Sequence, residues 1–280
     1  MRPSPEPLPI VFIHRGNSAY LPFTLAQAKL ASLASPVVLL GDRTNDQFPF
    51  VTHADMAGFA GQAAELAKVY KHRSPNGAPY ELFCFQRWFI LRDFMRANAL
   101  ERIVHVDSDV LLYVDVNVEQ RLWRDYDLTL VRGVCAGNMF VNRRGAIEEL
   151  CDWIWNLYTS ADSDAKLDAI YAWRSKTGEG VSDMVALKAI YDANRSRVAE
   201  MTGVREDDSY WDANIHLAEG FEHDGTIKRV RYHDRVPYAR HLASARDVRF
   251  KALHFQGVAK RHIEPHFRQG CPAASTAVAA

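Results

Sequence analysis

The sequence predicts an α/β domain with a largely parallel β-sheet. Two observations support this. Short apolar runs, typical of buried strands, alternate with longer segments in which apolar residues recur at helical spacing. Alternating strands and helices are typical of a parallel sheet covered by helices. Because the chain of 280 residues has no internal repeat and no long linker, we expect one domain over residues 10–270.

The first part of the chain contains several of these elements. Uninterrupted apolar runs predict strands, whereas Ala-rich or periodic segments predict helices. Ser18 is a candidate N-terminal cap for the first helix. The expected order is a Pro-rich lead (1–9), a strand (10–14), a helix (19–33), two strands (35–42 and 48–52) and a helix (54–70).

A helix over residues 79–100 is strongly predicted. Cys84, Trp88, Leu91 and Met95 recur at spacings of four and three, so they share one face. The apolar run "RIVHV" follows as a buried strand. The later strands are expected at 126–133, 136–142, 227–232 and 250–255, the helices at 144–159, 163–174 and 182–194, and a disordered tail at 271–280.

The composition excludes several classes of protein. Lys+Arg and Asp+Glu both total 34, so the broad basic surplus of a nucleic-acid-binding protein is absent. No apolar run is long enough to span a bilayer, and the first residues lack the apolar stretch of a signal peptide. The four cysteines have no CxxC spacing and are interpreted as small buried residues. These features predict a cytoplasmic protein with at most peripheral contact at the inner face of the membrane.

Asp107 and Asp109 stand where the strand "RIVHV" ends. Two charges beside a core are costly unless they are paired, exposed or bound to a metal. Ligands of parallel sheets bind beyond the carboxyl ends of strands, and paired carboxylates suit Mg²⁺ or Mn²⁺. The alternative is an ordinary turn, where Asp is common.

A second group of candidates follows the strand at 250–255. His254 closes that strand, Gly257 permits a tight turn, and Lys260 lies six residues after the histidine. An imidazole can bind a divalent ion, and a lysine attracts phosphate as a point charge. Taken singly, a half-buried histidine and a solvated lysine are the more ordinary interpretations.

Further candidates are weaker on their own. A turn containing His14 and Gly16 can approach a nucleotide, and Asp42 can accept a hydrogen bond from a ribose or a base, but ordinary turn chemistry explains them equally well. Arg87 stands on an otherwise apolar helix, where it is either paired or directed at a substrate. Asp183 begins a helix, a position that the helix dipole favours.

Together these residues resemble nucleotide-sugar glycosyltransferases of the GT-A fold, and especially glycosyltransferase family eight, the glycogenin-like and lipopolysaccharide galactosyltransferase group. The resemblance spans residues 10–262. It implies a Rossmann-like, mixed, mostly parallel sheet flanked by helices. Three segments carry it: "FQRWFILRDFMRANALERIVHVDSDVLLYVDV", "CAGNMFVN" and "HFQGVAK".

The resemblance implies a role for each matching residue. Asp107, Asp109 and His254 would hold Mn²⁺ or Mg²⁺, and Asp107 would also approach the ribose. Lys260 and the Gly257 backbone would hold the diphosphate, and Arg87 would touch the donor sugar or the diphosphate. Gly137 and Asn138 belong to the segment that resembles the family's sugar-pocket strand.

This sequence departs from the family pattern around the sugar. The pocket asparagine falls on Cys135, with Asn138 as a nearby substitute, and the Asp-Gln-Asp start of a helix reads Val181-Ser182-Asp183. The implied reaction moves a sugar from a nucleoside-diphosphate sugar, with UDP favoured, to a glycan or lipopolysaccharide-type acceptor. Retention is expected, and Asp183 is the candidate base if the reaction inverts instead.

Two other functions stay open at this stage. In a haloacid-dehalogenase-like phosphatase, Asp107 would be the nucleophile, and Lys188 with Asp207 and Asp208 would have to complete the site. Alternatively, the chain is a descendant of the transferase fold that binds nucleotide sugars without catalysis.

Overall fold

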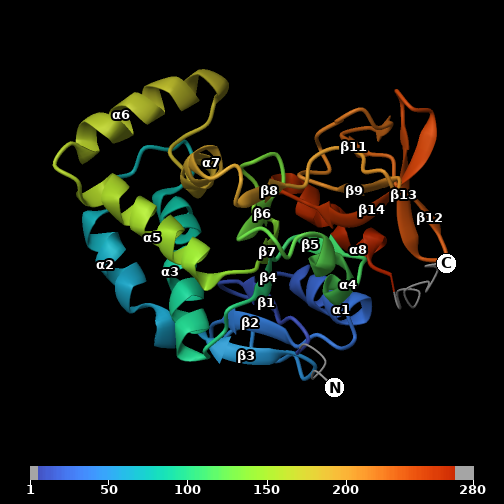
Figure 1. The fold of residues 1–280 in the computed structure, drawn as a ribbon, viewed down its shortest axis with the longest axis horizontal. Coiled ribbons are helices and arrows are strands. Elements are labelled where there is room, and N and C mark those ends of the chain that lie inside the picture. Colours follow the sequence, from blue (N-terminus) through green and yellow to red (C-terminus); the bar gives the residue numbers. More distant parts are fainter. Residues whose placement is uncertain (1–5, 269–280) are drawn as a thin grey trace.

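A computed structural model describes residues 6–268 of the chain. It confirms a single α/β domain with a mostly parallel sheet flanked by helices (Figure 1). The expected tail at 271–280 lies outside the described residues, as does part of the Pro-rich lead. The end of that lead already belongs to the fold, because Leu8 is buried and the Pro9 carbonyl oxygen accepts the Val104 N–H at 2.9 Å.

The central sheet, called sheet A here, has seven strands in the order β3-β2-β1-β4-β7-β6-β8. Only β7 runs against the others, since it pairs antiparallel with both neighbours while the remaining pairs are parallel. The sheet is therefore mixed and mostly parallel. Its strands are β1 (Ile10–Ile13), β2 (Val37–Gly41), β3 (Thr52–Asp55), β4 (Ile103–Val106), β6 (Leu128–Leu130), β7 (Asn138–Val141) and β8 (Val198–Glu200).

A second, smaller sheet, called sheet B, was not expected from the sequence. It has the order β12-β13-β14-β5, with β9 pairing along β14. A separate hairpin joins β10 to β11. The strands outside sheet A are β5 (Val110–Leu112), β9 (Ser209–Trp211), β10 (His223–Asp224), β11 (Ile227–Lys228), β12 (Arg231–His233), β13 (Val236–His241) and β14 (Arg246–His254).

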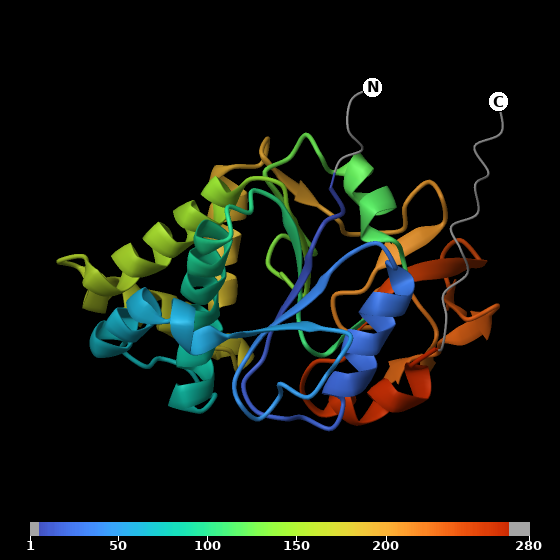
Figure 2. The ribbon, with the colours of Figure 1, turned by 90° about the horizontal axis from the view of Figure 1, so that it is seen from below.

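Helices cover both faces of sheet A. Figure 2 shows α2, α3 and α5 on one side, with α1 and the strands of sheet B on the other. Helices α5 and α6 have the predicted bounds. The helices are α1 (Leu21–Ala31), α2 (Gly61–Val69), α3 (Ala78–Ala97), α4 (Val116–Glu119), α5 (Arg144–Thr159), α6 (Ser163–Arg174), α7 (Asp183–Ala193) and α8 (Ile263–His266).

The core is divided by sheet A because side chains alternate between its faces. In β1, Val11 and Ile13 join the cluster packed under α3, α5 and α7, whereas Ile10 and Phe12 join the cluster under α1. A third cluster lies within sheet B and includes Phe250. Sheet B is thus packed as an integral part of the domain.

Several local expectations were wrong, among them the helix over 54–70, where the end of β3 and a 3₁₀ helix (Met56–Phe59) precede α2. The strand expected at 48–52 is β3, which is displaced to Thr52–Asp55 because it pairs in parallel with β2. The strand expected at 227–232 is split into β11 and β12. Ser18 does not cap α1, whose N-cap residue Tyr20 makes no side-chain capping bond; the Ser18 hydroxyl instead lies 3.1 Å from Nε2 of His14.

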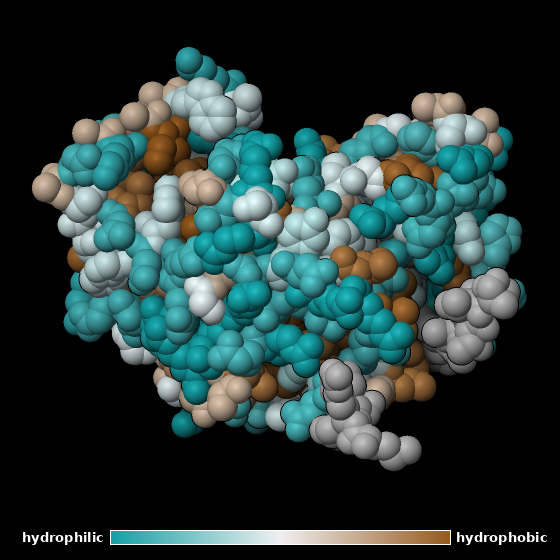
Figure 3. All heavy atoms as spheres, viewed as in Figure 1, coloured by the Kyte–Doolittle hydropathy of each residue, from teal (hydrophilic) through white to brown (hydrophobic). Residues whose placement is uncertain are grey.

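The described cysteines, Cys84, Cys135 and Cys151, are free thiols. The face shown in Figure 3 is mostly hydrophilic, with apolar groups in small patches. Between residues 6 and 268, no helix combines the length and apolar character that crossing a membrane requires.

Candidate active site

The turn Asp107-Ser108-Asp109 marks the point where the chain passes from sheet A to sheet B. β4 ends immediately before the turn and β5 begins immediately after it. The Asp107 N–H donates to the Gly137 carbonyl oxygen at 2.9 Å, and the Val110 N–H donates to the Asp107 carbonyl oxygen at 3.1 Å. Both carboxylates are therefore fixed at the carboxyl end of β4, where parallel sheets bind their ligands.

The two carboxylate oxygens of Asp107 have different environments. Oδ1 accepts hydrogen bonds from Nη1 of Arg87 at 2.5 Å and from Nε2 of His105 at 3.2 Å. Oδ2 faces Nε2 of His254 at 3.9 Å. Burial opposes ionisation, but the Arg87 guanidinium outweighs it and holds the pKa of Asp107 far below its usual range. Asp107 thus presents a charged oxygen toward His254.

His254 reaches this turn from sheet B. It is the last residue of β14 and pairs in register with Val110. Its backbone N–H donates to Oδ2 of Asp212 at 3.0 Å, and Oδ1 of Asp212 accepts from Nζ of Lys228 at 2.8 Å. The side chains of Asp212 and Lys228 are both 0% exposed. A fully buried ion pair therefore fixes the end of the strand that carries the histidine.

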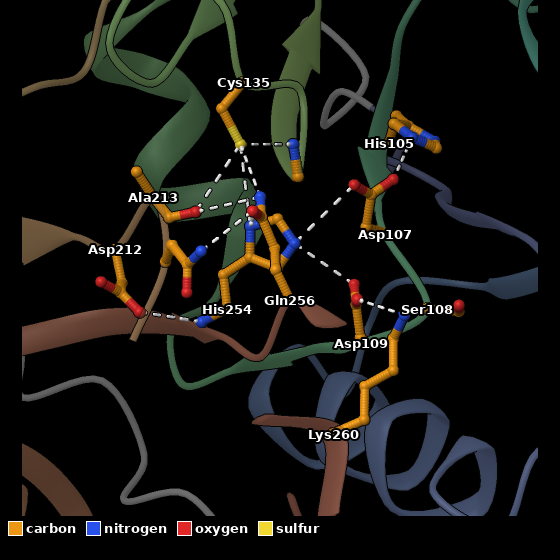
Figure 4. A network of polar contacts seen from close by, with 12 residues as sticks. His105, Asp107, Ser108, Asp109, Cys135, Asp212, Ala213, His254, Gln256 and Lys260 are labelled. Atoms are coloured by element: carbon orange, nitrogen blue, oxygen red, sulfur yellow. Dashed lines mark hydrogen bonds and ion pairs between the residues drawn. The ribbon is translucent and has the colours of Figure 1, made fainter. Parts of the chain in front are cut away.

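The two sides of the His254 ring have different partners, as Figure 4 shows. Nε2 lies 3.2 Å from Oδ1 of Asp109, whereas Nδ1 lies 3.7 Å from Sγ of Cys135 and 3.4 Å from Nε2 of Gln256. Burial opposes protonation of His254, but the Asp109 carboxylate outweighs it and raises the pKa well above its ordinary value. Nε2 is the ring atom presented to the aspartates.

Gly137 allows the chain before β7 to lie directly against this ring. A Cβ at residue 137 would stand 2.5 Å from Cε1 and 2.6 Å from Nδ1 of His254. These distances are too short for non-bonded atoms, so any side chain would displace the ring. The glycine therefore has a packing role beside His254.

The residues Asp107, Asp109 and His254 fit a divalent cation. Each offers one ligand atom, and these atoms lie within 4.8 Å of one another. Two carboxylate oxygens and one imidazole nitrogen form a mixed donor set suited to an ion such as Mn²⁺, while Mg²⁺ favours the oxygens. A cation there would also compensate the two neighbouring carboxylates, of which Asp109 is buried and Asp107 is half-buried.

Two cationic side chains flank the acidic turn. Lys260, in a short 3₁₀ helix (Gly257–His262), places Nζ 3.2 Å from Oδ2 of Asp109. Arg87 bridges from Asp107 to Asp183, where its Nε and Nη2 donate to Oδ2 at 3.2 and 2.7 Å. An anionic substrate group at the turn would attract both cations.

Gly257, the first residue of that 3₁₀ helix, has φ of 58°. A residue with a Cβ would be strained in this left-handed conformation. The predicted need for glycine in the turn between His254 and Lys260 therefore has a backbone cause.

Two cavities meet over the turn. The larger, about 490 Å³, extends toward α7 and the end of β14 and includes Asp183, Gly257 and His254 in its lining. The smaller, about 350 Å³, extends between the loop after β1 and the start of α3. This arrangement suits a ligand whose anionic group lies at the shared border and whose two ends enter the two cavities. Six residues line both cavities: Tyr80, Cys84, Arg87, Asp107, Asp109 and Lys260.

The structure brings only part of the predicted loop after β1 to this place. His14 lines the smaller cavity, and its Nδ1 lies 2.9 Å from Oγ of Ser108. Gly16 and Asp42 line neither of the two cavities. The Gly16 N–H donates to Oδ2 of Asp42 at 2.7 Å, and the Thr44 N–H donates to Oδ1 at 2.8 Å. Asp42 thus braces the loop that carries His14.

Asn138 is also not among the lining residues of these cavities. It is 1% exposed, and its side-chain amide has no hydrogen-bond partner among residues 6–268. Cys135, just before Gly137, lines the larger cavity instead. The structure therefore does not bring Asn138 to the cavity for which it was considered.

Four residues of the site are not predicted from the sequence: His105, Asp212, Lys228 and Glu81. A histidine two positions before Asp107 in an apolar strand is a usable signal, because alternate residues share one face of a strand. Glu81 lines the larger cavity from the first turn of α3. Asp212 and Lys228 give no local signal, since an isolated charged residue in sequence does not reveal burial.

Comparisons with known proteins give no family assignment. No protein-family model matches the chain, and no curated protein sequence matches it. Similar solved structures include mouse xyloside xylosyltransferase 1, with TM-score 0.42 and 8% identity over 73% of this chain and 87% of that chain. The WbbM bifunctional glycosyltransferase gives TM-score 0.42 and 14% identity over 76% of this chain and 41% of that chain.

A glycosyltransferase involved in glycosylation of the major capsid of PBCV-1 gives TM-score 0.39 and 10% identity over 91% of this chain and 99% of that chain. These identities and TM-scores are low, so the likeness assigns no function to this chain.

Proposed function

We propose that the protein is a metal-dependent glycosyltransferase of the GT-A class that uses a nucleoside-diphosphate sugar. The observation that carries the proposal is the position of the Asp107, Asp109 and His254 triad, flanked by Arg87 and Lys260, where two cavities meet. A nucleoside-diphosphate sugar has the matching layout, with its diphosphate in the middle. The nucleoside would enter the smaller cavity and the sugar the larger one.

In this proposal the chain's own cations stabilise the leaving group. When the sugar departs, negative charge grows on the diphosphate. The Lys260 ammonium and the Arg87 guanidinium lie beside the turn and would stabilise this charge. A Mn²⁺ or Mg²⁺ ion held by Asp107, Asp109 and His254 would add Lewis-acid stabilisation of the same charge. Arg87 would also keep Asp107 oriented toward the ion.

We favour retention of configuration at the sugar. Inversion needs a general base beside the acceptor hydroxyl, and Asp183 is the candidate in the larger cavity. Its Oδ2 already accepts hydrogen bonds from Nη2 of Arg87 at 2.7 Å and from Nε1 of Trp88 at 3.0 Å. These donors favour a role for Asp183 in holding Arg87, and a front-face route needs no protein base.

The finer features of the proposal come from the resemblance to family eight. They are a UDP-sugar donor carrying a hexose, an acceptor of glycan or lipopolysaccharide type, and a place in polysaccharide biosynthesis. They also include a cytoplasmic location with at most peripheral membrane contact.

The phosphatase alternative receives little support from the placement of its residues. Lys188 pairs with Asp192 one helical turn away on α7, and Asp207 and Asp208 pair with arginines of β14. None of the three residues lines either cavity with Asp107. The groups that would assist an Asp107 nucleophile are therefore engaged elsewhere.

A donor screen tests the proposed function. A panel of nucleotide sugars is incubated with the protein and Mn²⁺, and released nucleotide is measured with and without a chelator. Release should require the metal, disappear in Asp109→Asn and persist in the control Asp125→Asn, whose side chain is 88% exposed. Binding of nucleotide sugar without release would indicate the non-catalytic descendant. Release of phosphate from a generic phosphate ester, surviving loss of His254, would support the phosphatase.

A further inference from the structure

A buried carboxylate in the larger cavity has no part in the mechanism above. Glu81 is 1% exposed and lines this cavity. Its Oε2 accepts hydrogen bonds from Oγ of Ser74 at 2.7 Å and from Nδ2 of Asn76 at 2.9 Å. Its Oε1 has no hydrogen-bond partner among residues 6–268. Because Glu81 lines the cavity, Oε1 is the oxygen left for a ligand there.

Apart from His254 of the proposed metal site, the charged side chains found only in the larger cavity are carboxylates. Its cations, Arg87 and Lys260, lie on the border shared with the smaller cavity, and both are paired with aspartates. Beyond that border, the carboxylates are those of Glu81 and Asp183. The other polar residues that line this part are neutral amides, a hydroxyl and an imidazole: Asn76, Asn214, Gln256, Ser182 and His216.

We propose that Glu81 selects an uncharged, hydroxyl-rich sugar and excludes a sugar that bears a carboxylate. This inference rests on the proposed function, since it assigns the substrate class of the same site. Oε1 accepts a hydrogen bond from a sugar hydroxyl, which carries the required proton. A sugar carboxylate in that place has no proton to donate and would meet a like charge at short range.

Glu81 also holds the loop that contains Ser74, and this second role has to be separated from selection. A Cβ added at Gly180 would lie 2.4 Å from Cα of Ser74, so the loop packs tightly on the segment before α7. Ser74→Ala removes one hydrogen bond to Oε2 and leaves both Oε1 and the charge in place. Glu81→Gln keeps the shape and one acceptor oxygen for the loop but removes the charge.

The test measures binding of UDP, UDP-glucose and UDP-glucuronate in the presence of Mn²⁺ by calorimetry. The wild-type protein should bind UDP-glucose at least about tenfold more tightly than UDP-glucuronate, a free-energy gap that a hydrogen bond replaced by a like charge readily supplies. Glu81→Gln should reduce this ratio about fivefold or more, while Ser74→Ala should preserve it.

The outcomes separate this inference from the proposed function. If UDP binds with Mn²⁺ but the two sugars bind equally well to the wild type, the inference fails and the proposed function stands. The inference is also overturned if Glu81→Gln leaves the ratio of affinities for UDP-glucose and UDP-glucuronate unchanged, or if Ser74→Ala changes this ratio as much as Glu81→Gln does. If neither UDP nor any other nucleoside diphosphate shows metal-dependent binding, the proposed function fails, and this inference fails with it.

Discussion

The Asp212 carboxylate joins the backbone N–H of His254, at 3.0 Å, to the buried ammonium of Lys228, at 2.8 Å. The same ammonium donates to the Asn214 carbonyl oxygen and to Oε2 of Glu219, both at 2.9 Å. The histidine of the proposed metal site is therefore held by a charge network inside sheet B. The stability of this network and the geometry of the site are physically connected.

Lys228→Met should destabilise the protein strongly. The substitution leaves Asp212 without its counter-charge in the core, and removing one partner of a buried pair costs roughly 3–5 kcal/mol. Chemical denaturation would show this as a loss of unfolding free energy. The control Arg229→Met removes only a loose surface pair of 3.9 Å and should cost less than about 1 kcal/mol. Similar losses for the two variants would contradict the assigned role of the buried network.

Gly137→Ala should weaken metal-dependent binding of UDP. The new Cβ would overlap the His254 ring and shift Nε2, and displacing the support of a metal ligand typically lowers affinity by about 10–100-fold. Titration of UDP in the presence of Mn²⁺ measures the effect. Gly145→Ala is the matched control, because a Cβ at that position meets no atom within 4 Å. Equal affinities in the two variants would exclude a steric role for residue 137.

Lys260→Ala should reduce binding of UDP by about tenfold or more and leave binding of uridine nearly unchanged. The ammonium lies beside Asp109 and acts on phosphate charge, and hydrogen bonds to charged groups contribute about 1.5–3 kcal/mol. Calorimetry with both ligands separates the two effects. Arg261→Ala removes the adjacent exposed cation and serves as the control. A parallel loss of both ligands in Lys260→Ala would argue against a diphosphate contact.

Stability should fall as the pH drops below 6.5, in part through His266. Its Nδ1 lies 2.6 Å from the Tyr232 hydroxyl, and burial, aided by the Arg268 charge, lowers the pKa of His266 to about 4 from 6.5. Between these values the unfolded chain binds a proton that the folded chain does not, so acidification favours unfolding. The full effect amounts to about 3 kcal/mol.

Urea denaturation at several pH values between 7.5 and 4.5 checks this expectation. The variant His266→Gln should show a flatter dependence of unfolding free energy on pH than the wild type, because the titrating group is removed. An identical slope would mean that other groups cause the acid sensitivity.

The fold was predictable where the sequence carries a continuous local signal. β1 and β4 are continuous buried apolar runs, and α5 has its buried residues at helical spacing. Each of these patterns can be read from one short segment of the sequence. The meeting of Asp107 with His254 was expected only through the family resemblance. Its physical cause is the pairing of β14 with β5, which brings the histidine beside Val110.

Sheet B as a whole was not predictable because several of its strands are very short: β5, β9 and β12 have three residues each. β12, with the sequence Arg-Tyr-His, has no apolar alternation and is a strand only because β13 pairs with it. The burial of Lys228 was also not predictable, because its partner Asp212 is 16 residues away in the sequence. The sequence makes Asp42 a candidate to bind a ribose or a base, yet its oxygens accept hydrogen bonds from the N–H groups of Gly16 and Thr44.

The passage of the chain between its two sheets has a mechanical consequence. Asp107 and Asp109 follow the last residue of β4 in sheet A, while His254 ends β14 in sheet B. A cation bound by all three residues would be a reversible cross-link between the sheets, closing a long segment of chain in the folded state alone. Ligands that bind only the folded state raise its melting temperature. Metal supply would then set the resistance of this protein to unfolding as well as its readiness to react.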